Sequence, residues 1–424
     1  MPVLNNFLTR LVLCILALAI ALPSASAEQL SGQWTLEELA REALGTYPEI
    51  LASQSQQAAA RADLEGARWQ RFPTPSIEAS QDDAGNDIAL ARLQQPIWTG
   101  GRIRSGIEAA EARLQASAGG IGEAEQDVLL RLVESYIAAV RRQAQRTISI
   151  ENVRQHEELH GLISRRVARQ ISPQVDLALA DSRLAAAKSQ LSSVQQELQI
   201  ALDRLTELTG VPVAAVADLT GWATALPESR IQAQREAIEY SPRLAKLSAQ
   251  QMAASADVRA ERAALLPTVA VRLEHERGET DDSRALLVLE SEFGAGLSTI
   301  ASTNAAAARR DALRREQQTA ERELTTQIAI AWQQWRAARV RLESAQLQRE
   351  STRTVFESYT RQYVIGQKSW LDVLNATREA TTAASAVEEV RAQMREPMLR
   401  IAFLTGRLGE LSNIVRYSQS GGLN

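Results

Sequence analysis

The segment His156–His160 has the clearest spacing for catalytic chemistry in the sequence. It reads H-E-E-L-H and matches H-E-x-x-H, in which two histidines one helical turn apart hold zinc and the glutamate is the general base. Such a site needs a third ligand, and the only other histidine is His275, in a segment that we expect to be a strand. Glu158 also places a charge where zinc peptidases of this type usually have an uncharged residue. A zinc metallopeptidase is therefore the least favoured function, and two solvated or groove-facing histidines on a long helix are expected instead.

The rest of the sequence offers no other catalytic constellation. It contains no Ser-His-Asp set, phosphate-binding loop or cofactor fingerprint, so we expect no enzyme activity, no cofactor and no metal. The formal net charge is -4 and the pI is near 5.7, whereas a protein that binds nucleic acid should carry a basic face. We therefore expect no nucleic-acid partner.

The segment Met1–Ala27 has the pattern of a secretory signal peptide. Arg10 precedes the apolar run Leu11–Leu22, which is too short to span a bilayer, and the small residues Ala25–Ala27 form a cleavage site. The mature chain is expected to begin at Glu28 outside the cytoplasm. The only cysteine, Cys14, lies in the apolar run without the preceding small residue of a lipoprotein site, so neither a disulfide nor a lipid anchor is expected. No later segment has the roughly 20 apolar residues of a membrane helix, so any membrane-spanning part must consist of strands.

The chain is one unit written twice. Arg41–Ile50 resembles Arg235–Leu244 at a shift of 194 (235 − 41), and Leu208–Gly210 matches Leu404–Gly406 at a shift of 196 (404 − 208). Self-similarity at a fixed spacing is the signature of an internal repeat. We expect a signal peptide at 1–27, a first repeat at 28–210, a linker at 211–227, a second repeat at 228–406 and a tail at 407–424. In the first repeat, strands are expected at about 75–97 and long helices at about 102–209. In the second repeat, strands are expected at about 268–293 and long helices at about 296–406.

Each unit contains a helix that is too long for a compact domain. Between Arg102 and Gln170 little except Gly119–Gly120 opposes a helix, and at about 1.5 Å per residue this segment reaches about 100 Å. The returning helix has a heptad seam, with large residues opposite smaller ones three places later. The seam consists of Leu177, Leu184, Leu191, Leu198 and Leu205 with Ala180, Ala187, Val194, Ala201 and Leu208. The same register recurs in the second unit, so we predict a mainly α fold with a small β part, built of long antiparallel coiled-coil helices in two repeats.

A pair of short extended segments interrupts the helices of each unit. Val269, Val271 and Leu273 alternate with other residues, and after turn residues at 278–283 a second run returns at 285–293. The alternation is weaker in the other strands. Four strands cannot close a barrel, and an open edge in lipid would leave backbone groups unpaired at several kcal/mol each. The chain must therefore form oligomers if these strands lie in a membrane.

Three aromatic residues, Phe72, Trp98 and Phe293, lie where the expected strands meet helices. An aromatic belt at a membrane interface would have this placement, and ordinary packing at a strand end is the alternative.

Two motifs add to the repeated layout. The strand-to-helix junction Gln95–Arg102 reads QPIWTGGR, and the second helical tip, Tyr363–Leu374, reads YVIGQKSWLDVL. With these motifs the chain resembles the TolC-like outer membrane factor family, the channels of efflux and type I secretion, over essentially the whole mature sequence. Two segments depart from the family pattern: the second junction, 292–296, lacks the proline, and the first tip, Val167–Asp176, lacks the glycine.

The resemblance implies a homotrimer in the cell outer membrane, whose strands form one β-barrel in outer membrane lipid and whose helices form a tunnel through the periplasm. It also implies a periplasmic adaptor and an inner membrane transporter, ABC-type or proton-driven, which supplies the energy. Relatives in type I protein secretion usually lack a lipid anchor, so a passive exit duct for type I secretion is expected. Drug or small-molecule efflux is the alternative. A periplasmic coiled-coil adaptor is disfavoured because such adaptors normally have one helical hairpin, whereas this chain has two.

By the same resemblance the second tip forms a periplasmic gate. The implied site residues are Tyr363, Lys368 and Asp372 at the gate, and Gly366 and Asp176 at the tips where an adaptor docks. Three copies of Asp372 would form an acidic ring that favours cations, while Asn375 stands where relatives often have a second carboxylate. The alternative is that Asp372 only caps the last helix, and Asp176 holds the matching place in the first unit, where the same cap would serve.

Overall fold

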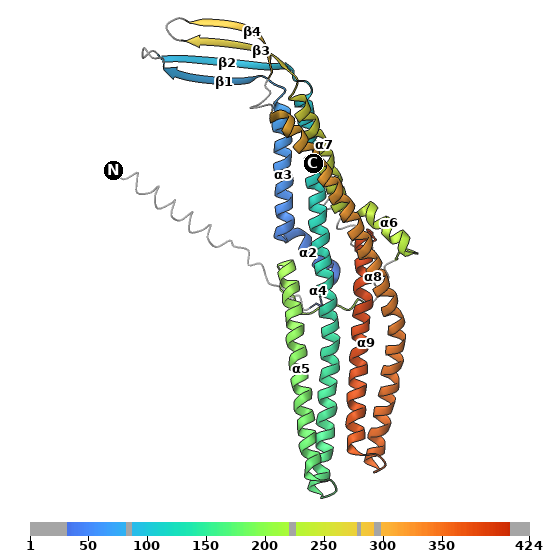
Figure 1. The fold of residues 1–424 in the computed structure, drawn as a ribbon. Helices are drawn as coiled ribbons and strands as arrows, with labels where there is room; N and C mark the ends of the chain where they lie inside the picture. Colours follow the sequence, from blue (N-terminus) through green and yellow to red (C-terminus); the bar gives the residue numbers. More distant parts are fainter. Residues whose placement is uncertain (1–31, 82–86, 220–225, 278–280, 292–297, 408–424) are drawn as a thin grey trace, which may run out of the picture.

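The molecule is a long rod of helices with a sheet at one end and two helical tips at the other (Figure 1). A computed structural model describes residues 32–81, 87–219, 226–277, 281–291 and 298–407. The expected signal peptide, Phe293 and tail residues 408–424 lie outside these described residues.

The elements follow one another twice in the same order. The first set is α2 (Leu36–Thr46), α3 (Pro48–Trp69), β1 (Thr74–Gln81), β2 (Asp87–Trp98), α4 (Arg102–Ala168) and α5 (Gln174–Thr209). The second set is α6 (Arg230–Tyr240), α7 (Pro242–Ala263), β3 (Thr268–Arg277), β4 (Asp282–Glu290), α8 (Ser298–Val364) and α9 (Trp370–Leu404). The start of α6 follows that of α2 at a shift of 194 (230 − 36), and the start of α8 follows that of α4 at a shift of 196 (298 − 102). The predicted mainly α fold of two repeats, each with a strand pair, is confirmed.

Local signals define the ends of the helices. In α2 the hydroxyl of Thr35 and the carboxylate of Glu38 form a capping box, which satisfies backbone N–H groups at the first turn. At the other end of each unit, Gly210 and Gly406 have φ of 72° and 70°, the left-handed conformation that ends helices. A Cβ on Gly406 would lie 2.6 Å from the ring of Tyr240, so this position also requires the smallest residue. The repeated L-T-G sequence is thus a pair of helix stops.

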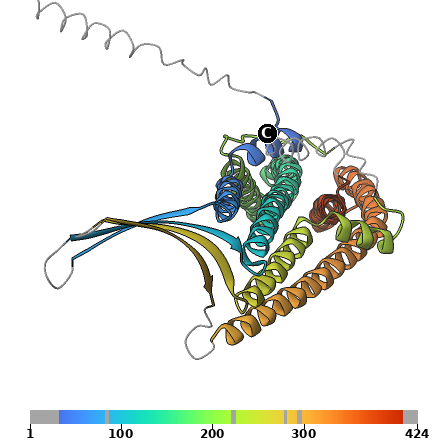
Figure 2. The same cartoon turned by 90° about the horizontal axis from the view of Figure 1, so that it is seen from above.

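The helices form a single curved wall, seen from above in Figure 2. Helix α4 lies in the middle, with α3 and α5 along one side and α7 and α9 along the other. Helix α8 packs on α7 and α9 and is the last long helix on that side, and the short helix α6 lies against it. The two long helices, α4 and α8, have 67 residues each, which at about 1.5 Å per residue corresponds to about 100 Å. None of the described helices combines the length and the apolar character of a membrane span.

The largest core lies halfway along the wall, where α2, α4, α5 and α9 meet the linker. Tyr136 is fully buried there, and its hydroxyl donates to the carbonyl oxygen of Ala217 at 2.7 Å and contacts that of Trp34 at 3.1 Å. Trp34 and Val216 also form a parallel backbone bridge. The linker between the repeats is therefore fastened across the first unit.

The two columns of the heptad seam of α5 differ in how deeply they are buried in the protomer. The smaller residues of the seam, from Ala180 to Leu208, are all buried against the rest of the protomer. Of the large residues, Leu205 is buried, whereas Leu177, Leu184, Leu191 and Leu198 are half-buried. Much of the leucine column therefore remains available to another helix.

Candidate functional site

The second tip encloses Tyr363, one of the three residues expected at the gate. Tyr363 is 5% exposed and packs against Trp370, with ring centroids 5.7 Å apart. Arg166 of α4 lies over the Tyr363 ring, with its guanidinium carbon 5.1 Å from the ring centroid. Burial raises the pKa of the phenol, against the smaller lowering effects of Arg166 and of Ser172 in the first tip. Tyr363 therefore joins the two tips of one chain.

Lys368 and Asp372, the other two residues expected at the gate, belong to the same tip as Tyr363 but contact other residues. The Lys368 ammonium lies over the ring of Tyr359, 4.3 Å from its centroid. Asp372 forms a capping box at the start of α9, in which its carboxylate accepts from the Ser369 hydroxyl at 2.8 Å and from the Ser369 N–H at 3.1 Å. These hydrogen bonds hold the pKa of Asp372 below its usual value. In the single chain, Asp372 has the geometry of a helix cap.

The first tip is built differently. Helix α5 begins after Pro173, which has no side-chain acceptor, so the first tip has no capping box, although Asp176 lies in the first turn of α5 as Asp372 does in that of α9. At the turn, Gln170 has φ of 59°, the only positive value among described residues other than glycine. Gly366 occupies the equivalent place in the second tip, with φ of 79° and open space where a Cβ would be. The first tip forms the same turn without the glycine.

The sequence did not reveal the partners of Tyr363. Arg166 and Ser172 come from the first unit, far earlier in the chain, and no spacing marks them. Trp370 could have been noticed, because a large aromatic residue at the first position of a helix next to a tip suggests a packing anchor.

The sheet has the order β1-β2-β3-β4, and all neighbouring strands are antiparallel. Directly paired residues share a face, so the register sorts every side chain. One face is mainly apolar, and its exposed residues include Ile77 (84%) and Leu287 (76%). Its apolar members are Pro75, Ile77, Ala79, Ala89, Ala91, Leu93, Val269, Val271, Leu273, Ala285, Leu287 and Leu289.

The opposite face carries a row of charges across three strands. The Glu274 side chain on β3 is 5% exposed and accepts from Arg92 of β2 at 3.1 Å and from Arg284 of β4 at 2.7 Å. A carboxylate removed from water needs such partners to remain ionised. The sheet therefore has one mainly apolar face and one face on which charged and apolar side chains are mixed, a division that the weak alternation of three strands did not reveal.

Aromatic rings gather where the sheet meets the helices. Phe72 and Trp98, both expected there, are about half exposed. Trp69 at the end of α3 is 68% exposed, packs on Phe72 with centroids 5.2 Å apart, and was not among the expected residues. The sequence did contain a signal for it, because Trp69 stands three positions before Phe72 at the same junction.

The histidines of the H-E-x-x-H segment point to different partners. His160 Nε2 lies 2.8 Å from a carboxylate oxygen of Asp181 on α5, and Glu157 pairs with Lys188 at 3.0 Å. His156 instead lines a hollow beside α9. His275 contacts the Ser283 hydroxyl in the sheet, at the other end of the rod. Among the described residues, no group of three His, Cys, Asp or Glu side chains comes together to hold a metal.

Comparisons with known sequences give a consistent result. The family profile described as outer membrane efflux protein matches residues 39–211 and 233–407. The alkaline protease secretion protein AprF of Pseudomonas aeruginosa is 23% identical over 349 residues, which cover 77% of this chain and 71% of AprF. The pyoverdine export outer membrane protein OpmQ of Pseudomonas putida is 27% identical over 340 residues, which cover 74% of this chain and 68% of OpmQ.

Solved structures share the fold. The outer-membrane channel OprN superposes with a TM-score of 0.79 at 20% identity, covering 88% of this chain and 89% of that chain. The outer membrane protein VceC of Vibrio cholerae superposes with a TM-score of 0.75 at 16% identity, covering 88% of this chain and 96% of that one. At 20% and 16% sequence identity, these superpositions show a shared fold alone.

Proposed function

The chain belongs to the outer membrane efflux protein family, and we propose that it works as a homotrimeric exit duct for type I protein secretion. As a member of that family it is an outer membrane export channel with its helical part in the periplasm, and it is not an enzyme. The observation that carries the proposal is that the protomer ends in open edges on both sides.

The sheet has two such edges. Strand β1 pairs only with β2, and β4 pairs only with β3, so each outer strand presents unpaired N–H and C=O groups. In lipid each unpaired group costs several kcal/mol. Joining β4 of one copy to β1 of the next removes both edges, and three copies give a barrel of twelve strands (3 × 4) with the apolar face toward lipid.

The wall of helices has edges on the same two sides. On one side, the leucine column of α5 is only half-buried in the protomer. On the other side, α8 exposes large apolar residues along its length: Ile300, Ile330, Val340, Leu347, Val355 and Val364. Packing α8 of one copy against α3 and α5 of the next covers both surfaces and continues the coiled-coil pattern.

The proposed trimer also assigns roles to the two ends of the rod. Tyr363, Lys368 and Asp372 form the periplasmic gate, and the turns at Gly366 and near Asp176 contact a periplasmic adaptor, which connects to an inner membrane transporter. At the other end, Phe72 and Trp98, with Trp69 added, lie at the membrane interface, where aromatic side chains are favoured.

The relatives support two kinds of cargo. The name of AprF describes secretion of a protease, which supports a protein cargo for this chain. The name of OpmQ describes export of pyoverdine, a small molecule, and OpmQ has the higher identity of the two, so small-molecule export is the second candidate function.

Deletion of the gene for this protein from its host distinguishes a protein cargo from a small-molecule cargo. With a protein cargo, the culture medium of the deletion strain loses one or more large polypeptides that are restored by the intact chain. Loss of small molecules alone, or increased sensitivity to toxic compounds with an unchanged set of secreted proteins, would favour efflux instead. A soluble periplasmic monomer would contradict both functions.

A further inference from the structure

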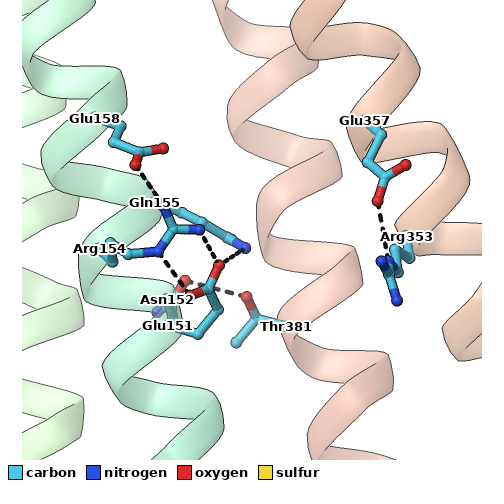
Figure 3. Close-up of polar contacts among 8 residues, drawn as sticks. All are labelled: Glu151, Asn152, Arg154, Gln155, Glu158, Arg353, Glu357 and Thr381. Atoms are coloured by element: carbon cyan, nitrogen blue, oxygen red, sulfur yellow. Dashed lines mark hydrogen bonds and ion pairs between the residues drawn. The ribbon is translucent and has the colours of Figure 1, made fainter.

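A hollow of about 220 Å³ opens where α4, α5 and α9 meet in the lower half of the rod. Asn152 of α4 and Thr381 of α9, hydrogen-bonded at 3.1 Å, lie at its side, and Figure 3 shows this contact between the two helices. Two arginines and a histidine face the hollow, and its lining contains no carboxylate. The lining residues are Asn152 and His156 from α4, Arg183, Ala186, Ala187 and Gln190 from α5, and Leu374, Asn375, Arg378, Thr381 and Thr382 from α9.

The two arginines differ from most of their cationic neighbours. Arg154, close by on α4, is paired with both Glu151 and Glu158, and Arg353 on α8 is paired with Glu357 at 3.0 Å (Figure 3). Arg183 and Arg378 form no ion pair with any residue that the structure describes. The chain has 51 acidic and 47 basic residues, so acidic residues are not scarce. Two guanidinium groups without an ion-pair partner, from two different helices around one hollow, are an arrangement that an anion would stabilise.

The neutral lining suits the same kind of ligand. Each guanidinium has five N–H donors, and the amides of Asn152, Gln190 and Asn375 add further donors. Burial, and then the charge of Arg183, lower the pKa of His156, so the imidazole is neutral near pH 7 and has one ring N–H to donate. The Thr382 hydroxyl adds one more donor, whereas the hydroxyl of Thr381 is directed to the Asn152 side chain and to the carbonyl oxygen of Thr377.

We propose that this hollow binds a small oxyanion, with phosphate or carboxylate chemistry, between Arg183 of α5 and Arg378 of α9. The volume equals that of roughly seven water molecules at about 30 Å³ each, which fits a small ion with some water and is below the usual size of a site for a drug-sized ligand. A bound anion would connect the first helical hairpin to the second. The proposal does not depend on the cargo of the channel or on its partners.

Calorimetry on the full-length protein in detergent tests the site. Inorganic phosphate and acetate are titrated separately in a chloride buffer at constant ionic strength. Saturable binding of at least one of the two anions, near one per chain, is expected, and the anion that binds more tightly identifies the chemistry. Arg183→Gln and Arg378→Gln should each weaken binding about tenfold or more, because hydrogen bonds to charged groups are lost. Arg353→Gln, which removes an exposed arginine outside the hollow, should leave binding unchanged.

Two results would overturn the proposal. One is the absence of saturable binding for both anions. The other is an equal loss in Arg353→Gln, which would mean that the anions respond to general surface charge. The variants are expected to fold because Arg183 and Arg378 are exposed. The thermal midpoint of each variant without anion verifies this, and a rise of the midpoint with anion in the parent protein gives an independent measure of binding.

Discussion

Gln170 and Gly366 occupy equivalent positions in the two helical tips, related by the repeat shift of 196 (366 − 170), and both have the left-handed backbone, with φ of 59° and 79°. For most residues with a Cβ this conformation costs about 1–2 kcal/mol, and glycine avoids the cost. The two tips thus make the same turn, but the first tip contains local strain that the second does not.

Gly366→Ala should lower the free energy of unfolding by about 1 kcal/mol, because alanine must adopt the left-handed conformation. Gln170→Gly should leave it unchanged or raise it slightly, because the relief of strain is offset by the greater flexibility of glycine in the unfolded chain. Denaturation of the two variants in parallel measures both effects. Equal destabilisation would mean that backbone conformation does not distinguish the tips.

Leu191→Asp should weaken the trimer, because a charge would enter the half-buried leucine column that we propose to face the next protomer. Ser192→Asp, one position farther and exposed, is the matched control and should leave assembly unchanged. Native mass spectrometry in detergent measures the oligomer. A Leu191→Asp protein that stays fully trimeric would show that the seam assignment is wrong.

Asp372→Ala should reduce cation selectivity in planar bilayers if three copies of Asp372 line the gate. Ser369→Ala is the control that separates gate from cap, because it removes the capping hydroxyl and keeps the carboxylate. It should cost about 1 kcal/mol of stability without changing selectivity. Identical behaviour of the two variants would mean that Asp372 acts only as a helix cap.

Tyr363→Phe combined with Lys368→Ser should raise the conductance of the channel in planar bilayers, since contacts at the tip are lost.

Ser283→Cys should react with a membrane-impermeant thiol reagent on intact cells, because the β3–β4 connection is expected at the cell exterior. Ser193→Cys, exposed on α5, should react only after the outer membrane is opened. Ala84, the other turn position of interest, lies outside the described residues. Labelling of Ser193→Cys but not Ser283→Cys in intact cells would mean that the orientation in the membrane is the reverse of the expected one.

Stability should fall at acidic pH partly through His156. Its pKa is lowered in the folded protein, mainly by burial, and Arg183 and Arg378 face the same hollow. The unfolded chain therefore binds a proton more readily, near its ordinary pKa of about 6.5, so the contribution of His156 is present above that pH and is lost as pH falls through the folded value. His156→Gln should flatten the fall in thermal midpoint below about pH 6.5, measured in buffers without phosphate or carboxylate. An unchanged profile would exclude this contribution.

The sequence predicted the repeated architecture because repetition and heptads are long patterns that many residues share. The L-T-G helix stops, the strand pairs and the lengths of α4 and α8 follow from such patterns. Contacts between the repeats were not predictable in the same way. The pairs Arg92 with Glu274, Tyr363 with Arg166, and Asn152 with Thr381 join distant segments, and neither hydrophobic spacing nor local propensity specifies which side chains meet.

The join between β2 and β3 has a consequence for how the chain reaches its folded state. Residues of β2 pair with partners 171 to 188 positions later in the chain (269 − 98 and 277 − 89). A chain that emerges from the secretion machinery N-terminus first therefore exposes β2 as an open strand edge until nearly two thirds of the protein has appeared, and a lone two-stranded hairpin is marginally stable in water. Such non-local pairing is slow and prone to aggregation. The first half of the molecule therefore cannot complete its own sheet before the second half arrives, and β2 is open to wrong pairing during this interval.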